Sequence, residues 1–277
     1  MNEKHPFKIY TTQDLQNSSL IVGWHEDVGE LGARVVDYLN EKLGSKECGE
    51  IEPVDFFPLG GVSIEDNVAN FPESRFYCCQ EKNLVIFKSS SPRYEWYRFL
   101  SSVLDAAEHH FGVKEVYAIG GMVSLSAHTS PRQLVAVSNM PKMKNILSHY
   151  GLARDIDYET PPGQRPTLNT FLLWSAKNRN IPAAALWVPI PFYLLPVEDP
   201  KACRTTIEFF DKRFSLGIDF TDIDEAMGEQ NEKLARIRSS FSEIDRYIRN
   251  LESNLTLSQE ENEKLAKEMA EFLKRID

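Results

Sequence analysis

The sequence has few cysteines and none of the spacings that cysteine-based sites require. Its four cysteines are Cys48, Cys78, Cys79 and Cys203, and no two of them form a CxxC pair. Zinc-binding spacings are therefore missing, and so is the HExxH motif. A chain of 277 residues has no need of a disulfide framework. We expect buried, reduced thiols and no metal site.

Long apolar runs are missing as well. No segment approaches about 18 consecutive apolar residues, the length that a helix needs to cross a bilayer. The polar residues 1–5 lead into no apolar signal segment. The sequence therefore predicts a cytoplasmic protein.

Positive charge is in short supply. The chain has 31 basic against 41 acidic residues, a net charge of -10, and the segment 218–277 alone has 9 basic and 15 acidic residues. Phosphate backbones and anionic lipids bind basic surfaces. Nucleic acid and membranes are therefore not expected as partners.

Motifs for catalysis or nucleotide binding are also missing. The sequence contains no GxGxxG, no GxxxxGK[ST] and no GxSxG, which mark dinucleotide sites, P-loops and hydrolase nucleophiles. Its scattered carboxylates form no recognisable acid–base pair. We therefore expect no catalytic residue, no metal and no cofactor, and the sequence leans against an enzyme without deciding the question.

What the sequence does contain is an alternation of strands and helices. Apolar runs such as 20–24, 116–119 and 183–188 predict buried strands, and amphipathic segments such as 92–111 and 200–214 predict helices. This alternation is typical of an α/β fold with a mainly parallel sheet and helices on both faces. We expect this core domain to cover residues 1–217.

The pattern changes in the segment 218–277. Apolar residues recur there in alternating steps of three and four, the spacing of a coiled-coil seam. The seam consists of Leu234, Ile237, Phe241, Ile244, Ile248, Leu251 and Leu255. Two helices are predicted, about 229–253 and 259–276, with a capping box at the start of the second. The seam needs a cover, from its own chain or from another one.

One group of residues forms a candidate pocket. It lies where predicted strands end, which is the edge at which open α/β sheets bind ligands. The candidates are Trp24, Asp27, Gly120, Gly121 and His128. Each also fits a structural role, as a turn, a helix cap or a hydrogen-bonding loop residue.

Four segments, in order along residues 18–217, resemble one known family. They are Val22-Gly23-Trp24 with Asp27 and Gly29, then Pro92-Arg93-Tyr94-Glu95-Trp96, then Val116 to Gly121, then the helix opening Asp199-Pro200-Lys201-Ala202. This ordered set is similar to the proteasome assembly chaperone family of the second-subunit type, with its archaeal and bacterial relatives.

The resemblance implies a three-layer α/β/α core like that of the phosphorylase/hydrolase fold, homo-oligomers and no established catalysis. Some archaeal members carry a C-terminal hydrophobic–Tyr–any tail that engages proteasome α-subunits. Here the penultimate residue is Ile276, which argues against docking by such a tail.

Two functions follow as hypotheses. The first is a homo-oligomeric assembly-chaperone-like or scaffold protein that binds itself and another protein, such as a proteasome subunit. The alternative is a small-molecule-binding protein or enzyme with its site at the strand ends. The sequence identifies neither the partner, the number of subunits, any bound small molecule, nor whether the last helices fold back or pair between chains.

Overall fold

The computed structural model describes residues 6–11, 15–58, 62–65, 67–152 and 163–275. The chain divides into two compact units. Unit 1 comprises residues 1–27, 32–120 and 135–186, and unit 2 comprises residues 28–31, 121–134 and 187–277. The predicted division into a core to residue 217 and an extension from residue 218 stays a prediction.

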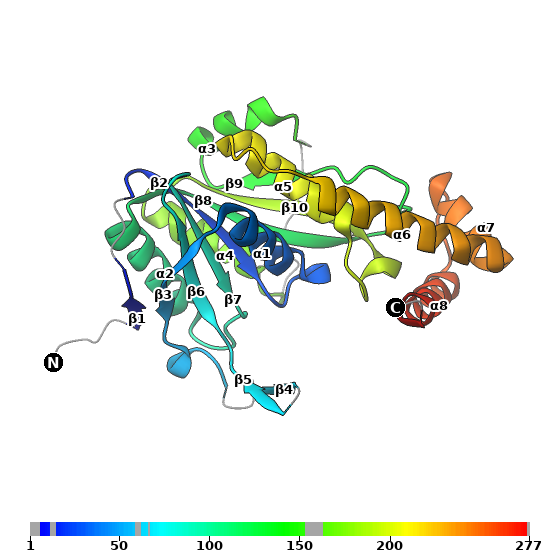
Figure 1. The fold of residues 1–277 in the computed structure, drawn as a ribbon, viewed down its shortest axis with the longest axis horizontal. Coiled ribbons are helices and arrows are strands. Elements are labelled where there is room, and N and C mark those ends of the chain that lie inside the picture. Colours follow the sequence, from blue (N-terminus) through cyan, green and yellow to red (C-terminus); the bar gives the residue numbers. More distant parts are fainter. Residues whose placement is uncertain (1–5, 12–14, 59–61, 66, 153–162, 276–277) are drawn as a thin grey trace. The chain divides into compact units, whose positions relative to one another are not determined.

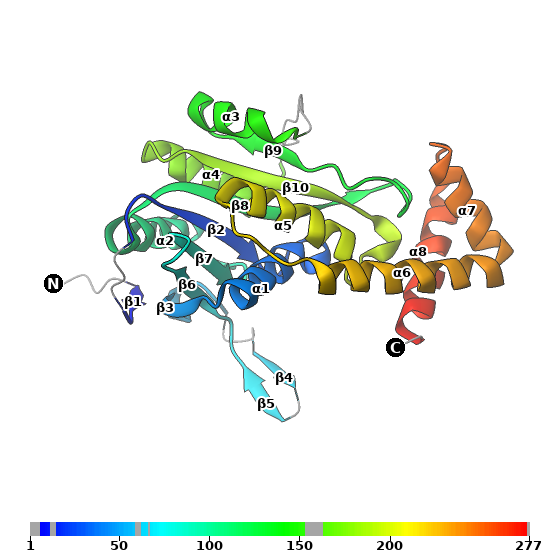
Figure 2. The same cartoon turned by 45° about the horizontal axis from the view of Figure 1, so that its top comes forward.

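An eight-stranded sheet organises unit 1 (Figure 1), with the strand order β1-β3-β6-β7-β2-β8-β10-β9. Its strands are β1 (Phe7–Ile9), β2 (Ser18–Trp24), β3 (Lys46–Ile51), β6 (Ser74–Cys79), β7 (Leu84–Ser89), β8 (Val113–Ser124), β9 (Val135–Ser138) and β10 (Ala183–Pro191). A separate hairpin, β4 (Ser63–Glu65) and β5 (Val68–Asn70), stands apart from this sheet in Figures 1 and 2.

The sheet is mixed, so the prediction of a mainly parallel sheet is wrong. Strand β2 is parallel to both β7 and β8, whereas β1–β3, β3–β6 and β6–β7 are antiparallel. The reason is connection length. Strands β6 and β7 are joined by a tight turn, and a tight turn allows only antiparallel pairing. Hydrophobic periodicity predicts strands but carries no information about their direction.

Helices cover both faces of the sheet in unit 1. They are α1 (Leu31–Leu43), α2 (Trp96–Phe111), α3 (Pro141–Leu147) and α4 (Leu168–Asn178). Neighbouring residues of a strand point to opposite faces. On β2, a Cβ at Gly23 would meet α1, whereas Trp24 contacts Phe99 of α2 and Asn169 of α4. Helix α1 therefore lies on one face, and α2 and α4 lie on the other (Figure 2).

Unit 2 contains α5 (Pro200–Phe214), α6 (Thr221–Ser240), α7 (Ser242–Glu252) and α8 (Gln259–Arg275). The prediction of a single helix over about 229–253 is wrong. The helix is interrupted at Phe241, whose φ of -130° and ψ of 97° are those of an extended residue. Ser242 then begins α7. The heptad spacing continues through the break, so the apolar pattern could not reveal it. Helix α8 corresponds to the second predicted helix. Among the helices described, none has the length and hydropathy to cross a membrane.

Cys48 and Cys78 form a disulfide, which corrects the prediction of reduced thiols at these two positions. Both residues are on neighbouring antiparallel strands, and a bulge in β3 lies between Glu47 and Gly49. The bulge brings the Cα atoms of the two cysteines to 6.1 Å, within the range that a disulfide spans. Cys79 and Cys203 are buried free thiols, as predicted.

Thiol titration tests this assignment. Protein purified without reductant and then denatured should react with a thiol reagent at Cys79 and Cys203 only, the two free thiols. The same protein reduced before denaturation should react at every cysteine. A Cys48→Ser variant provides the control, because it should gain one reactive thiol, at Cys78. Equal titres for reduced and untreated wild-type protein would contradict the disulfide.

Candidate functional site

The clearest candidate site in unit 1 is a row of aromatic side chains on α2 and α4. The ring centroids of Trp96 and Phe171 lie 6.3 Å apart, those of Phe171 and Trp174 lie 5.2 Å apart, and those of Trp174 and Tyr97 lie 5.9 Å apart. The Phe171 and Trp174 rings are stacked, with 4° between their planes. Tyr97 is 59% exposed and Trp174 is 46% exposed. We call these four residues the aromatic row.

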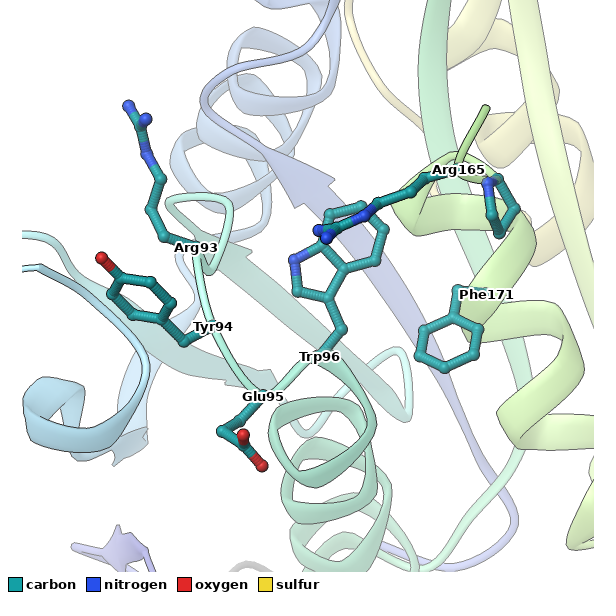
Figure 3. Close-up of a pocket in the computed structure, with 7 residues that line it drawn as sticks. Arg93, Tyr94, Glu95, Trp96, Arg165 and Phe171 are labelled. Atoms are coloured by element: carbon teal, nitrogen blue, oxygen red, sulfur yellow. The ribbon is translucent and has the colours of Figure 1, made fainter. Parts of the chain in front are cut away.

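A pocket of about 400 Å³ adjoins one end of the aromatic row (Figure 3). Its lining comprises Arg93, Tyr94, Glu95, Trp96, Arg165, Pro166 and Phe171. In Figure 3 the Arg165 side chain extends across the Trp96 indole, and the Glu95 carboxylate points away from both arginines. Apolar rings and two arginines thus line one pocket, although the Arg93 side chain points away from Trp96 in this view.

Residues around this pocket are held in place by hydrogen bonds that they donate to the carbonyls of buried neighbours. The amides of Arg93 and Tyr94 donate to the Phe56 carbonyl at 3.0 and 3.3 Å. The Trp96 indole Nε1 donates to the Pro92 carbonyl at 2.6 Å. Glu95, at the start of α2, has a φ of 50°. Such a left-handed conformation costs energy in a residue other than glycine and is frequent at functional sites.

The predicted pocket residues are divided between the two units. Trp24, Asp27 and Gly120 are in unit 1, and Gly121 and His128 are in unit 2. The grouping of all five in one pocket stays a prediction. The contacts of the individual residues show what each of them does within its own unit.

In unit 1 the tryptophan and the aspartate have structural contacts. Trp24 is buried, and its Nε1 donates to Asn169 Oδ1 at 2.6 Å. Asn169 Nδ2 in turn donates to the Ile119 carbonyl. Asp27 Oδ2 accepts a hydrogen bond from the Gly32 amide at 3.2 Å, in the first turn of α1.

In unit 2, Gly121 is required by packing. A Cβ at this position would lie 2.1 Å from the Val28 carbonyl oxygen. Real Cβ atoms do not approach backbone oxygens so closely, so only glycine fits. This close approach explains the glycine at position 121.

His128 is a buried residue of unit 2, held by Tyr193. The Tyr193 hydroxyl accepts from the His128 amide at 2.6 Å and lies 3.0 Å from its Nδ1. Burial, with a further contribution from Arg238, lowers the pKa of His128 to about 4. Burial also raises the pKa of Tyr193. His128 is therefore neutral at physiological pH.

The loop after His128 is fastened to α5. Lys201 Nζ donates to the carbonyls of His128, Thr129 and Ser130 at 3.3, 3.2 and 2.9 Å. Beside it lies a second cavity of about 380 Å³. This cavity is lined by His128, Thr129, Lys201, Asn231, Ala235 and Arg238.

His128 makes stability depend on pH. Its pKa is 6.5 as an unperturbed group and about 4 in the folded protein, so the unfolded chain binds the proton first as the pH falls. The free energy of unfolding should fall by about 2 kcal/mol between about pH 7 and about pH 4.5 because of this residue. Arg132, Lys201, Arg238 and Glu252 are the charged groups that act on it.

Urea unfolding over this pH range measures the effect. Carboxylates titrate in the same range, so the quantity to compare is the difference between wild type and His128→Asn. That difference should shrink as the pH falls. A His109→Asn variant, changed at an exposed histidine of α2, should follow wild type throughout. Parallel curves for wild type and His128→Asn would refute the prediction.

The seam of the C-terminal segment is largely covered within unit 2. Leu234, Ile237, Ile244, Ile248 and Leu251 are buried in one cluster with residues of α8 and of the turn at 192–194. Phe241 stacks on Phe272 at 4.1 Å, and Leu255 is 57% exposed. The structure therefore contains the fold-back arrangement. Pairing of the seam with another chain stays a prediction.

The sequence does not predict a binding site at the aromatic row or at the two arginines of the pocket. In the predicted helix 92–111, Trp96 belongs to the apolar stripe that faces the core, and Phe171 and Trp174 lie in a segment for which no site is predicted. The available signal was that Tyr94 and Tyr97 are off that stripe. The residues that complete the site lie about 70 positions further along the chain.

Comparison with solved structures shows a common fold. Rv2714 of Mycobacterium tuberculosis, of unknown function, aligns with a TM-score of 0.77 at 17% identity, over 92% of this chain and 90% of that chain. Rv2125 of the same organism, a proteasome-assembly chaperone homologue, has a TM-score of 0.68 at 16% identity, over 83% and 99%. PbaB of Pyrococcus furiosus, an archaeal proteasome activator, has a TM-score of 0.65 at 19% identity, over 84% and 98%.

The curated proteins contain no significant match. A family model, by contrast, matches residues 20–238, which include the four segments that resemble proteasome assembly chaperones. This match covers most of the 277 residues. The chain therefore belongs to the PAC2 family.

Proposed function

We propose that this protein is a cytoplasmic, homo-oligomeric assembly-chaperone-like protein that acts through protein–protein contacts. Membership of the PAC2 family supports a chaperone-like role. Two structural neighbours point in the same direction, one named as a proteasome-assembly chaperone homologue and one as a proteasome activator. A proteasome subunit is accordingly the first partner to test.

The observation that carries this proposal is the aromatic row. Aromatic residues are enriched at the centres of protein interfaces, where they supply much of the binding energy. Tyr97 and Trp174 are about half exposed, although aromatic side chains of this size are usually covered in a folded protein. Their positions on two rigid helices suit a surface that binds a partner without rearrangement.

The C-terminal helices are the proposed self-association element. Most of the seam is buried within the chain, but Leu255 remains exposed beside a cavity of about 220 Å³ that Leu125 and Leu257 also line. Leu125 is 60% exposed as well. Removing residues 229–277 should therefore reduce the number of subunits in the assembly in solution. An unchanged number of subunits and unchanged partner capture would argue against this element.

Affinity capture from an extract of the source organism tests the proposal as a whole. The bait is the tagged full chain, and the matched comparison is a double variant Tyr97→Ala, Trp174→Ala, changed only at exposed positions. We expect stoichiometric capture of subunits of one multisubunit complex by the wild type, reduced at least tenfold by the variant. A co-purifying small molecule without any protein partner would instead favour a ligand-binding or catalytic role.

A further inference from the structure

We propose that the pocket at Arg93 and Arg165, together with the aromatic row, binds an acidic, extended peptide segment of a partner protein. The segment pairs its carboxylates with the two arginines and places an apolar side chain against Trp96 and Phe171. This inference rests on the proposed function, since it names the chemistry of the partner that the same surface receives.

The first step is the state of the two arginines. Within the described part of the chain, neither guanidinium has a carboxylate partner. Other arginines of this acidic protein are paired: Arg75 with Glu47, Arg179 with Asp105 and Arg204 with Asp224, for example. Two unpaired guanidinium groups at one opening are therefore available for an anionic partner.

The second step is the shape of the donor groups. A guanidinium presents a planar fork of donors that matches a carboxylate, and bidentate pairs of this type are stronger than neutral hydrogen bonds. The arginines come from two segments, one before α2 and one before α4, on either side of Trp96 (Figure 3). A segment with carboxylates on both sides of an apolar side chain would satisfy this arrangement.

The third step is the extent of the surface. The aromatic row continues from the pocket along α2 and α4 to Tyr97 and Trp174. A small anion would occupy only part of this pocket of about 400 Å³ and would leave these two rings uncovered. An extended peptide covers both the pocket and the row, and it buries apolar area in addition to its charge pairs.

The fourth step is preorganisation. Two backbone hydrogen bonds to Phe56 hold Arg93 and Tyr94, and Thr167 Oγ1 accepts from the Thr170 amide at 3.2 Å to begin α4 beside Arg165. A surface that is already ordered loses little conformational entropy on binding.

Fluorescence anisotropy with synthetic peptides tests the inference. The probe is a labelled heptapeptide in which Asp and Glu flank Leu and Phe, and its matched comparison replaces every Asp by Asn and every Glu by Gln. The acidic peptide should bind the full-length protein at least tenfold more tightly than its amide counterpart. Arg93→Ala and Arg165→Ala should each weaken binding about tenfold.

Control variants make the result specific. Arg236→Ala, at an exposed arginine of α6 that pairs with Glu232 on the same helix, should bind the acidic peptide like wild type. Equal affinity for the acidic and amide peptides would overturn the inference, as would wild-type affinity of both pocket variants. It would also be overturned if a single-stranded oligonucleotide bound more tightly than the peptide, or if the surface proved to be covered by a second copy of the chain.

The peptide experiment and the capture experiment can fail separately. If capture from the extract succeeds but is unaffected by Arg93→Ala and Arg165→Ala, the acidic-segment inference is wrong and the proposed function stands. If the peptide binds as expected but no protein complex is captured, the surface is correctly identified and the assembly role is wrong.

Discussion

Replacing Arg132 by alanine should lower the free energy of unfolding by about 3–5 kcal/mol. Arg132 Nε lies 2.9 Å from Asp199 Oδ2, and both side chains are 2% exposed. Its Nη1 also donates to the Ser130 carbonyl at 3.0 Å. Removal of the guanidinium leaves the Asp199 carboxylate buried without its counter-charge, and that carboxylate also caps α5 through the Ala202 amide.

Urea unfolding at about pH 7 measures this loss, with Lys212→Ala as the comparison. Lys212 pairs with Glu208 on the same helix, α5, but the two side chains are 64% and 39% exposed. Exposed pairs contribute at most about 1 kcal/mol. A similar, small effect in both variants would show that the Arg132–Asp199 pair does not stabilise unit 2.

Gly23→Ala should destabilise the protein by about 3 kcal/mol. Gly23 is on the central strand β2, and a Cβ there would lie 2.2 Å from the Gly32 carbonyl oxygen and 2.8 Å from Val36 Cγ1. The first of these atoms belongs to the backbone of α1 and cannot rotate away. Helix α1 would have to move off the sheet, and the well-packed interface between them would open.

Gly228→Ala is the matched control, because it adds the same methyl group where there is space. Gly228 lies within α6, and nothing lies within 4 Å of a Cβ at this position. Alanine favours a helix over glycine by up to about 1 kcal/mol, so this variant should be as stable as wild type or slightly more stable. The midpoint of thermal unfolding is measured for both variants and for wild type. If Gly23→Ala unfolds at the same temperature as Gly228→Ala, β2 and α1 are farther apart than these distances indicate.

Local signals in the sequence predicted many of the elements correctly. Helix α2 ends at Gly112, and α5 begins after the capping residue Asp199, as expected from their sequences. The α/β class is predicted as well. These features depend on residues close together in the chain, which is why the spacing of apolar residues and capping residues predicts them.

The direction of the strands and the candidate site depend on distant residues. Strand β3 pairs with β6 across more than 20 intervening residues, and no periodicity encodes such a pairing. The pocket likewise combines Arg93 and Trp96 with Arg165 and Phe171. The spacing of the seam residues indicates an apolar face but does not identify the residues that cover it. In the structure these include Leu265 and Met269 of the same chain.

The Cys48–Cys78 bond closes a loop that contains the β4–β5 hairpin, since its two cysteines are 30 residues apart. A protease that cuts the chain once inside this loop would produce two fragments that remain covalently joined. Such nicked protein would migrate as a single species on a denaturing gel without reductant and as two bands with it. The hairpin could therefore be opened, or a short tag inserted there, while strands β3 and β6 remain tied together.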